Sequence, residues 1–250
     1  MRFWSIEKEQ EDILGYELMR RSSKDRNGRK VCLPIIEKTV KNALKAIKEA
    51  NGLADLIELR MDYLRNSELM PLLKAGEKPF IITNRRKEEG GKCGSKEKSR
   101  FRILREAVEL GAEYVDVEMS SEKPLLRDLI ANKKKTRIVL SFHDFQKTPS
   151  PGELKKLFNR MAQTGGDVVK IVSFAQSWED NFNILSLIPY AKKREQEIVA
   201  FCMGERGKMS RIFAPFMGAA WTYAALSKGK TSAPGQLTIR EMKEICERLR

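Results

Sequence analysis

The sequence predicts an α/β protein of the (β/α)8 TIM-barrel class. From Lys30 onward, short apolar runs rich in β-branched residues alternate with longer amphipathic stretches. This alternation is typical of parallel strands joined by helical crossovers. The runs are almost continuously apolar, as expected for strands covered on both faces. The chain has 250 residues, which is enough for one barrel of this kind.

Seven segments fit buried strands, and an eighth is ambiguous. AAWTYAAL at 219–226 fits either a last strand or the continuation of a helix. The alternative fold is a doubly wound open sheet. No G-x-G-x-x-G follows the first strand, which argues against a dinucleotide-binding version of that fold. The other strand candidates are 31–36, 55–61, 79–84, 113–119, 137–143, 167–174 and 197–203.

Helical patterns separate these strands. Residues 38–51 place apolar side chains near one face, and Gly52 stops the pattern. The stretch 150–166 opens with Ser-Pro and closes with a pair of glycines, which are typical helix start and stop signals. The remaining helix candidates are 98–111, 181–193 and 237–250.

Residues 1–30 differ from the rest of the chain. They are charged and carry only a weak helical pattern, and their last part, RRSSKDRNGRK, is typical of a linker. We therefore expect an N-terminal charged arm or linker at 1–30 and a single catalytic barrel domain at 31–250.

Composition narrows the classes of function. The chain has 48 Lys and Arg against 34 Asp and Glu, a net charge of +14 that favours anionic partners. Its four cysteines are far apart, without a C-x-x-C, which indicates a reducing compartment. The first residues turn acidic where a signal peptide needs an apolar stretch. No segment approaches the roughly 20 apolar residues of a membrane span. We expect a cytoplasmic protein that binds no membrane.

His143 is the single histidine of the chain. One imidazole excludes a His-rich metal site and the H-E-x-x-H arrangement of zinc proteases. If imidazole does acid–base chemistry near neutral pH in this protein, His143 is the residue that does it. By count alone, a surface or packing role for His143 is equally open.

Ionisable residues stand at the ends of several predicted strands. In a parallel barrel, catalytic groups lie at the C-terminal ends of the strands. Strand-end residues two positions apart share a face, so they can point into one site together. The candidates are Glu58, Arg60, Arg85, Glu88, Glu89, Asp116, Glu118, His143 and Lys170.

Lys170 is the most informative of these residues, because it lies in the middle of Val-Val-Lys-Ile-Val. A buried ammonium is costly, so apolar surroundings favour the neutral amine. A neutral amine attacks carbonyl carbons and forms Schiff bases. Two other interpretations stay open: an ion pair with a strand-end carboxylate such as Glu118, or an edge strand that points Lys170 to solvent.

His143 lies one strand before Lys170 and near the same end. Neighbouring strands are under about 5 Å apart, so the two side chains can share one substrate. A Schiff base withdraws electrons, and a histidine can remove the adjacent proton and later return one. This pair fits β-elimination, isomerisation and aldol chemistry alike.

Arginines after three strands suggest the kind of substrate. Arg60, Arg85 and Arg211 can each bind a carboxylate with a planar fork, although ordinary surface ion pairs are the alternative. The segment GKTSAPGQ at 229–236 fits a flexible lid that carries Ser232 and Gln236 over the site, or a plain connecting loop.

Six motifs together resemble one known family. They occur in family order from about Val31 to the C-terminus. The motifs are IELRMDYL, NRRKEEGG, SFHDF, DVVKIV, KMSRI and SAPGQ. The chain resembles the type I 3-dehydroquinate dehydratases, the Schiff-base class of 3-dehydroquinase.

The resemblance implies a (β/α)8 barrel and the conversion of 3-dehydroquinate to 3-dehydroshikimate and water, in the shikimate pathway of aromatic amino acid and chorismate biosynthesis. Lys170 would form the imine, His143 would be the general acid and base, and Glu89 would orient the histidine. Arg211 would hold the substrate carboxylate. Such enzymes use no metal and no organic cofactor, and are commonly homodimers. The other substrate-binding matches are Glu58, Arg60, Arg85, Ser232 and Gln236.

Two features depart from the family pattern. Glu37 follows the first strand where many members have glycine, a change expected to alter the floor of the barrel. Glu88 and Glu89 are adjacent, so either is a candidate partner of the histidine. Counting back from the glycine pair favours Glu89.

Two rival functions make different predictions. A Schiff-base aldolase would also use a lysine on strand six, but should carry a phosphate-binding end near strands seven and eight. A nucleic-acid-binding protein is suggested by charge alone, and no helix-turn-helix or aromatic-basic motif supports it. We therefore expect a small-molecule substrate and no nucleic-acid partner.

Overall fold

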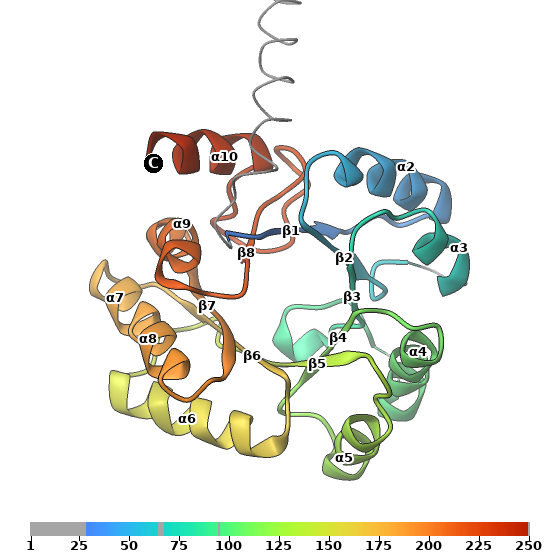
Figure 1. Cartoon of the computed structure of the whole chain (residues 1–250), viewed down its shortest axis with the longest axis horizontal. Coiled ribbons are helices and arrows are strands. Elements are labelled where there is room, and N and C mark those ends of the chain that lie inside the picture. The colour runs from blue at the N-terminus through green and yellow to red at the C-terminus, as the bar shows by residue number, and fades with distance from the viewer. Residues whose placement is uncertain (1–28, 65–67, 95, 250) are drawn as a thin grey trace, which may run out of the picture.

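Each strand of the molecule pairs in parallel with the next strand in the sequence. The structure is a computed structural model, and it describes residues 29–64, 68–94 and 96–249. The sheet order is β7-β6-β5-β4-β3-β2-β1-β8, so the last strand returns to the first. The predicted (β/α)8 barrel is confirmed (Figure 1). The doubly wound alternative is wrong, because the strand order never reverses within the sheet.

The strands match the predicted segments closely. β8 is the exception, because only two residues of the ambiguous segment 219–226 pair with β1. The gap between β7 and β8 is spanned by the Ala220 amide, which donates to the Ile198 carbonyl at 2.8 Å. The strands are β1 (Val31–Ile35), β2 (Leu56–Arg60), β3 (Phe80–Thr83), β4 (Tyr114–Glu118), β5 (Arg137–His143), β6 (Val168–Phe174), β7 (Glu197–Met203) and β8 (Thr222–Tyr223).

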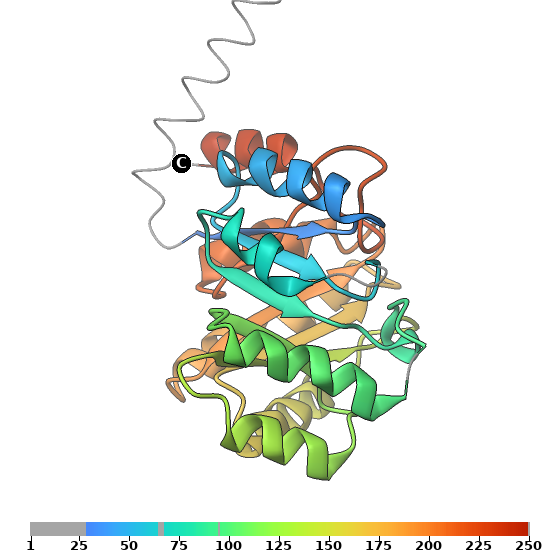
Figure 2. The same ribbon diagram turned by 90° about the vertical axis from the view of Figure 1, so that its right-hand side faces the viewer.

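Helices surround the barrel on its outside (Figures 1 and 2). The segment predicted as one helix at 181–193 forms two, because Pro189 cannot continue a helix past the carbonyl of Leu185. The helices are α2 (Val40–Asn51), α3 (Leu69–Lys74), α4 (Glu97–Glu109), α5 (Lys123–Ala131), α6 (Pro151–Thr164), α7 (Glu179–Leu185), α8 (Leu187–Lys192), α9 (Lys208–Met217) and α10 (Ile239–Arg248), with a 3-10 turn, η1 (Lys87–Glu89), after β3.

Helix starts carry the expected capping chemistry. Ser150 accepts a hydrogen bond from the amide of Glu153, and the Glu153 carboxylate accepts from the amide of Ser150. Gly165 ends the same helix at φ 98°, a backbone conformation that residues with a β-carbon rarely adopt. The Ser-Pro start and glycine stop predicted for this helix are therefore confirmed.

Alternation along each strand divides the core into two layers. In β6, Val169 and Ile171 pack outward against the helices, whereas Val168 and Val172 point into the barrel. Since side chains alternate with a period of two, Lys170 points into the barrel between these two valines. Apolar residues such as Tyr114 and Trp221 fill the inner core, and the polar groups gather nearer the C-terminal strand ends.

No helix among the residues that the structure describes is long and apolar enough to cross a membrane. The arm predicted at 1–30 falls almost entirely outside the described residues. Arg29 and Lys30 are the exceptions. The Arg29 guanidinium lies 4.8 Å from the centre of the Phe216 ring on α9, and the Lys30 carbonyl accepts a hydrogen bond from the Thr222 amide at 3.0 Å.

Candidate active site

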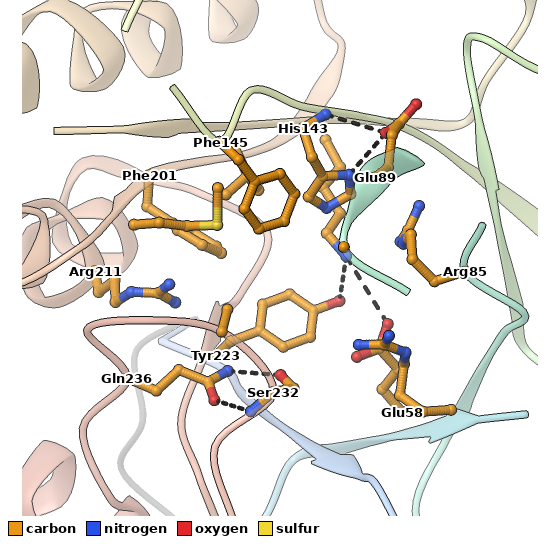
Figure 3. A pocket seen from close by; sticks show the side chains of 16 residues that line it. Glu58, Arg85, Glu89, His143, Phe145, Phe201, Arg211, Tyr223, Ser232 and Gln236 are labelled. Atoms are coloured by element: carbon orange, nitrogen blue, oxygen red, sulfur yellow. Dashed lines mark hydrogen bonds and ion pairs between the residues drawn. The ribbon is translucent and has the colours of Figure 1, made fainter. Parts of the chain in front are cut away.

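A pocket of about 450 Å³ opens at the C-terminal ends of the strands. All nine residues to which the family resemblance assigns a role line it, although they come from six strands or the segments that follow them (Figure 3). Aromatic and apolar side chains complete the wall. The predicted residues in the lining are Glu58, Arg60, Arg85, Glu89, His143, Lys170, Arg211, Ser232 and Gln236.

Lys170 is buried at the base of this pocket, with 4% of its surface exposed. Its ammonium donates to Asp116 Oδ2 at 2.8 Å and to the Tyr223 hydroxyl at 3.2 Å. Glu58 Oε1 lies 3.9 Å away. The lysine is therefore charge-paired before any substrate arrives.

The partner of Lys170 differs from the one suggested by the sequence. Strand register aligns Lys170 with Ser141 and Ser141 with Glu118, yet the ion pair forms with Asp116, two residues earlier. Barrel strands are tilted and staggered, so residues in register do not lie at one height. The edge-strand interpretation is wrong, because β6 lies between β5 and β7.

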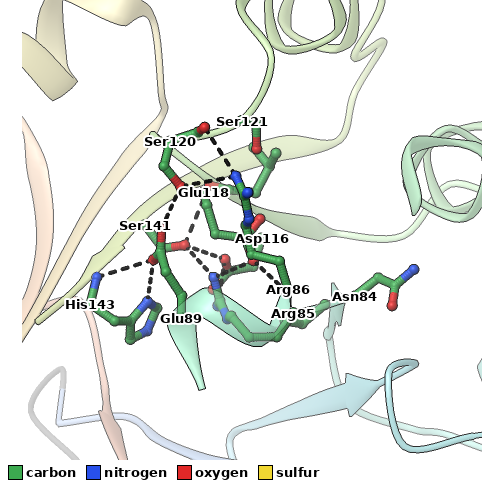
Figure 4. Close-up of polar contacts among 12 residues, drawn as sticks. Asn84, Arg85, Arg86, Glu89, Asp116, Glu118, Ser120, Ser121, Ser141 and His143 are labelled. Carbon is green, nitrogen blue, oxygen red and sulfur yellow. Dashed lines mark hydrogen bonds and ion pairs between the residues drawn. The ribbon is translucent and has the colours of Figure 1, made fainter. Parts of the chain in front are cut away.

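His143 forms a dyad with Glu89. Its Nδ1 lies 3.0 Å from Glu89 Oε2, and its backbone amide donates to the same oxygen at 3.2 Å. A carboxylate on Nδ1 keeps the proton of a neutral imidazole on that nitrogen, so Nε2 carries the lone pair. Ser120 donates to the other oxygen of Glu89 at 2.6 Å and fixes the carboxylate (Figure 4).

The environment keeps this histidine uncharged at neutral pH. Burial, assisted by the positive charges of Arg85 and Lys170, lowers the pKa of His143 to about 4, although Glu89 acts in the opposite direction. An uncharged imidazole is the form that a general base requires. Burial alone would raise the pKa of Glu89, but the contact with His143 and the charge of Arg85 hold it below its usual value.

The choice between two adjacent glutamates is decided by geometry. Glu89 contacts His143, whereas the largely exposed Glu88 pairs with Arg86 at 3.1 Å. The glycines that follow are needed for close packing. A β-carbon at Gly91 would lie 2.0 Å from the Arg85 carbonyl oxygen, and Gly90 has φ 77°. This tight turn directs Glu89 inward.

Arg85 stands in a buried network of alternating charges (Figure 4). It binds Asp116 at 2.7 Å and Glu118 at 3.0 Å, and Glu118 also binds Arg100 of α4 at 2.5 Å. Burial alone would lower the pKa of Arg85, but these carboxylates raise it. Burial alone would raise the pKa of Asp116, and Arg85 and Lys170 hold it far below its usual value.

Arg60 and Glu58 are held by short local contacts. The Arg60 guanidinium binds both oxygens of Asp62 at 2.8 Å. Glu58 accepts a hydrogen bond from the Thr83 hydroxyl at 2.7 Å. Both side chains are buried in the pocket wall, so their conformations are set in advance of ligand binding.

Arg211 is the contrasting cation of the pocket. It is fully buried on α9, and its guanidinium lies 4.4 Å from the centre of the Phe201 ring. Nη2 donates to the Pro234 carbonyl at 3.2 Å, while Nε and Nη1 have no hydrogen-bond partner among the described residues. Burial lowers the pKa of Arg211 to about 9. A buried unpaired guanidinium is costly unless an anion binds it.

The loop at 229–236 covers the Arg211 side of the pocket. Ser232 and Gln236 hold each other through two hydrogen bonds, at 2.7 and 3.0 Å. Lys230 pairs with Glu37 at 2.7 Å, joining the loop to the segment after β1. The expectation that Glu37 alters the barrel floor is therefore wrong, because Glu37 follows the C-terminal end of β1, which is the opposite end of the barrel.

The structure adds residues to the site that sequence reasoning left without a role. Asp116 was visible as a carboxylate in an apolar strand, but its pairing with Lys170 depends on barrel stagger. Tyr223 lies in the ambiguous last strand, so nothing in the sequence placed it beside the lysine. Phe145, two residues after His143, lines the mouth.

Comparison with known proteins agrees with this geometry. A family model described as type I 3-dehydroquinase matches residues 31–249. The 3-dehydroquinate dehydratase of Methanocaldococcus jannaschii is 37% identical over 219 residues, covering 86% of this chain and 96% of the relative. That of Pyrococcus abyssi is 37% identical over 211 residues, covering 84% and 94%.

A solved structure shows the same architecture. The type I 3-dehydroquinate dehydratase of Clostridium difficile, described with covalent modified comenic acid, superposes with a TM-score of 0.79 at 27% identity. The match covers 88% of this chain and 92% of the other. Fold, family model and sequence relatives agree over the same barrel residues. The chain therefore belongs to the type I 3-dehydroquinase family of hydro-lyase enzymes.

Proposed function

We propose that this protein dehydrates 3-dehydroquinate to 3-dehydroshikimate through a Schiff base on Lys170, a step of the shikimate pathway. The observation that carries the proposal is the combination in one pocket of three groups: a buried lysine, a histidine–carboxylate dyad and the unpaired guanidinium of Arg211. Family membership supports the same reaction.

Arg211 would hold the substrate carboxylate. Its unpaired Nε and Nη1 atoms can form a charge-assisted, forked contact with a carboxylate. Arg85 is unsuited to this task, because Asp116 and Glu118 already bind it. Ser232 and Gln236 lie on the loop next to Arg211 and would bind hydroxyl or carboxylate oxygens of the ring. The substrate would thus enter with its carboxylate toward α9 and its ketone toward β6.

Lys170 would then attack the ketone and form an imine. The imine withdraws electrons from the neighbouring carbon, which makes the C2 proton acidic. Nε2 of His143 would remove that proton, and Glu89 would stabilise the imidazolium that forms. The same imidazolium would return its proton to the C1 hydroxyl as it leaves as water. Hydrolysis of the imine would release the product and restore the lysine.

The proposal assigns no metal and no organic cofactor to the reaction. The electron sink is the protonated imine, and the proton carrier is the imidazole, so the chain's own side chains provide both functions. The covalent ligand named for the Clostridium difficile relative is consistent with covalent chemistry in this family. We further propose a cytoplasmic homodimer, and light scattering of the purified protein tests the dimer.

Borohydride trapping tests the mechanism directly. The protein is mixed with 3-dehydroquinate, reduced with sodium borohydride and digested for mass spectrometry, while the enone absorbance of the product is followed in parallel. We expect product formation and a reduced adduct on the peptide that contains Lys170. Product formation with an adduct elsewhere, or with none, would refute the Schiff-base mechanism. Absence of product would refute the reaction itself.

The two alternative functions are a Schiff-base aldolase and a nucleic-acid-binding protein. The family match gives neither any support. The aldolase interpretation required a phosphate-binding end near β7 and β8, whereas that corner holds the buried Arg211 under the loop at 229–236. A guanidinium binds phosphate as well as carboxylate, so the family match is what favours a carboxylate substrate here.

A further inference from the structure

Tyr223 is a buried titratable residue of the pocket to which the proposed reaction assigns no task. It belongs to β8 and pairs in register with Cys32 of β1. Only 3% of its surface is exposed. Its ring centre lies 4.6 Å from Lys170 Nζ, and its hydroxyl accepts a hydrogen bond from that atom at 3.2 Å (Figure 3). Tyr223 therefore touches the atom that the proposed reaction uses as its nucleophile.

The number of hydrogen bonds to Lys170 limits how its amine can point. An ammonium has three N–H donors. Asp116 takes one at 2.8 Å and Tyr223 takes a second at 3.2 Å. Glu58 Oε1, at 3.9 Å, is beyond hydrogen-bonding distance. Among the described residues, one donor is therefore left over, on the side of Nζ away from Asp116 and Tyr223.

Loss of that third proton creates the nucleophile. The neutral amine keeps two N–H groups and gains one lone pair. If Asp116 and Tyr223 keep their hydrogen bonds, the lone pair occupies the remaining tetrahedral direction. We propose that Tyr223 is a positioning residue that, together with Asp116, aims the lone pair of Lys170 at the substrate ketone. This inference rests on the proposed function.

The properties of the phenol suit this task. Burial, with Glu58 nearby, raises the pKa of Tyr223 well above its ordinary value, so the phenol stays neutral. A neutral oxygen binds the amine without adding a second full negative charge beside Asp116. It therefore orients the nitrogen through a hydrogen bond to a neutral partner.

Imine formation begins with a proton transfer from Lys170. His143 accepts the third proton of the ammonium, and the lone pair forms a bond to the ketone carbon while the carbonyl π electrons move to oxygen. One N–H proton passes to that oxygen. The resulting hydroxyl leaves as water with the proton held by His143, and the nitrogen electrons form the C=N bond. The iminium keeps a single N–H, for which Asp116 is the stronger acceptor, so Tyr223 serves the attack and not the later elimination.

Tyr223→Phe tests the inference, because it removes the hydroxyl and keeps the ring. Tyr114→Phe is the matched control, since Tyr114 is also a tyrosine of the inner core but its hydroxyl contacts Arg137. The rate of borohydride-trapped adduct on Lys170 is measured by rapid quench. The deuterium isotope effect on kcat is measured with substrate labelled at C2.

We expect Tyr223→Phe to slow adduct formation on the order of tenfold. Its isotope effect should fall toward one, because imine formation becomes the slow step. Tyr114→Phe should keep both wild-type values. A second variant without the hydroxyl, Tyr223→Met, should show the same defect, and melting temperatures identify any variant that fails to fold.

The outcomes separate this inference from the proposed function. Absence of a Lys170 adduct in the wild-type protein would overturn the proposed mechanism. A wild-type adduct combined with unchanged trapping rate and isotope effect in folded Tyr223→Phe or Tyr223→Met would overturn the role of Tyr223 alone. A lower turnover with an unchanged isotope effect would also count against it, since a merely structural defect behaves in that way.

Discussion

Two buried cations of the pocket, Lys170 and Arg211, differ in their partners. Lys170 binds Asp116 and Tyr223 and has Glu58 nearby. Arg211 is also buried, yet within the described part of the chain the hydrogen-bond and cation–π partners of its guanidinium are a backbone carbonyl and the face of Phe201. The carboxylates that line the pocket or pair with its cations lie on or after β2, β3 and β4. Among the described residues, none of them contacts Arg211.

This difference matches the two tasks that the proposed Schiff-base mechanism requires. A nucleophile must be held in one direction, so it benefits from partners that are already in place. A group that binds an anion must be left without one, because the ligand provides the missing charge. Under the proposed mechanism, the paired Lys170 is the cation that performs chemistry and the unpaired Arg211 is the cation that binds the ligand.

The largest expected effect comes from Lys170→Met. Without the amine no imine can form, so turnover should fall on the order of 10⁴-fold or more. Product binding should persist, because Arg211 is untouched. Steady-state kinetics and calorimetric titration with product check both parts. Substantial turnover by this variant would show that the paired lysine is not the nucleophile.

Arg211→Met should have the opposite profile. We expect KM to rise roughly 100-fold with a smaller change in kcat, because a charge-assisted fork to the carboxylate is lost. Unfolding should not become easier, since the change removes an unpaired buried charge. Arg85→Met is the control: it leaves Asp116 and Glu118 short of a partner and should cost about 3 kcal/mol of unfolding free energy. Equal destabilisation by both changes would remove the distinction between the two arginines.

The pH dependence of kcat/KM tests the dyad of His143 and Glu89. Protonation of His143 removes the base, so the rate should decline as pH falls through about 4, the lowered pKa of this residue. Glu89→Gln removes an influence that raises that pKa, so the decline should move to lower pH. The plateau should also drop by roughly 10- to 100-fold, because the imidazolium loses its carboxylate. An acid limb near the ordinary histidine value, about 6.5, would contradict the environment described for His143.

The smallest effect is expected at the loop over Arg211. Lys230→Met breaks the contact with Glu37, in which the lysine is half exposed. Exposed ion pairs contribute about 0 to 1 kcal/mol, so KM should change by less than about fivefold. Glu37→Gln should match it within error, because each change removes the same pair. A large change in kcat from either variant would mean that this contact controls more than the loop position.

Local patterns predicted the fold well where they were strong. The strands around Lys170 and His143 were predicted from their apolar runs, and the helix start at Ser150 from its Ser-Pro signal. The structure confirms all three. Three helices, α3, α5 and α9, were not predicted from the sequence. Two of them are short, and α9 follows a glycine-containing segment and includes Pro215. Weak or interrupted patterns do not separate a helix from a loop.

The sequence predicted which residues line the site better than it predicted which of them contact one another. The six family motifs identified nine site residues, and all nine line one pocket. Their partners were predicted less well. Asp116 rather than Glu118 binds Lys170, and Glu37 lies after the C-terminal end of β1 rather than at the barrel floor. Pairing depends on strand tilt and side-chain direction, which no single segment encodes.

The sequence by itself determined which residues could react: a lysine between β-branched neighbours, one histidine, and arginines after separate strands. Residue type and sequence neighbours are enough to identify groups that could react, so this part could be predicted from the sequence. Only the tertiary structure decided which of these charges are already neutralised. Asp116 meets Lys170 across two strands, Tyr223 reaches the same atom from the last strand, and Arg211 remains unpaired on α9. Distances between segments far apart in the chain set these contacts, and closure of the barrel sets those distances.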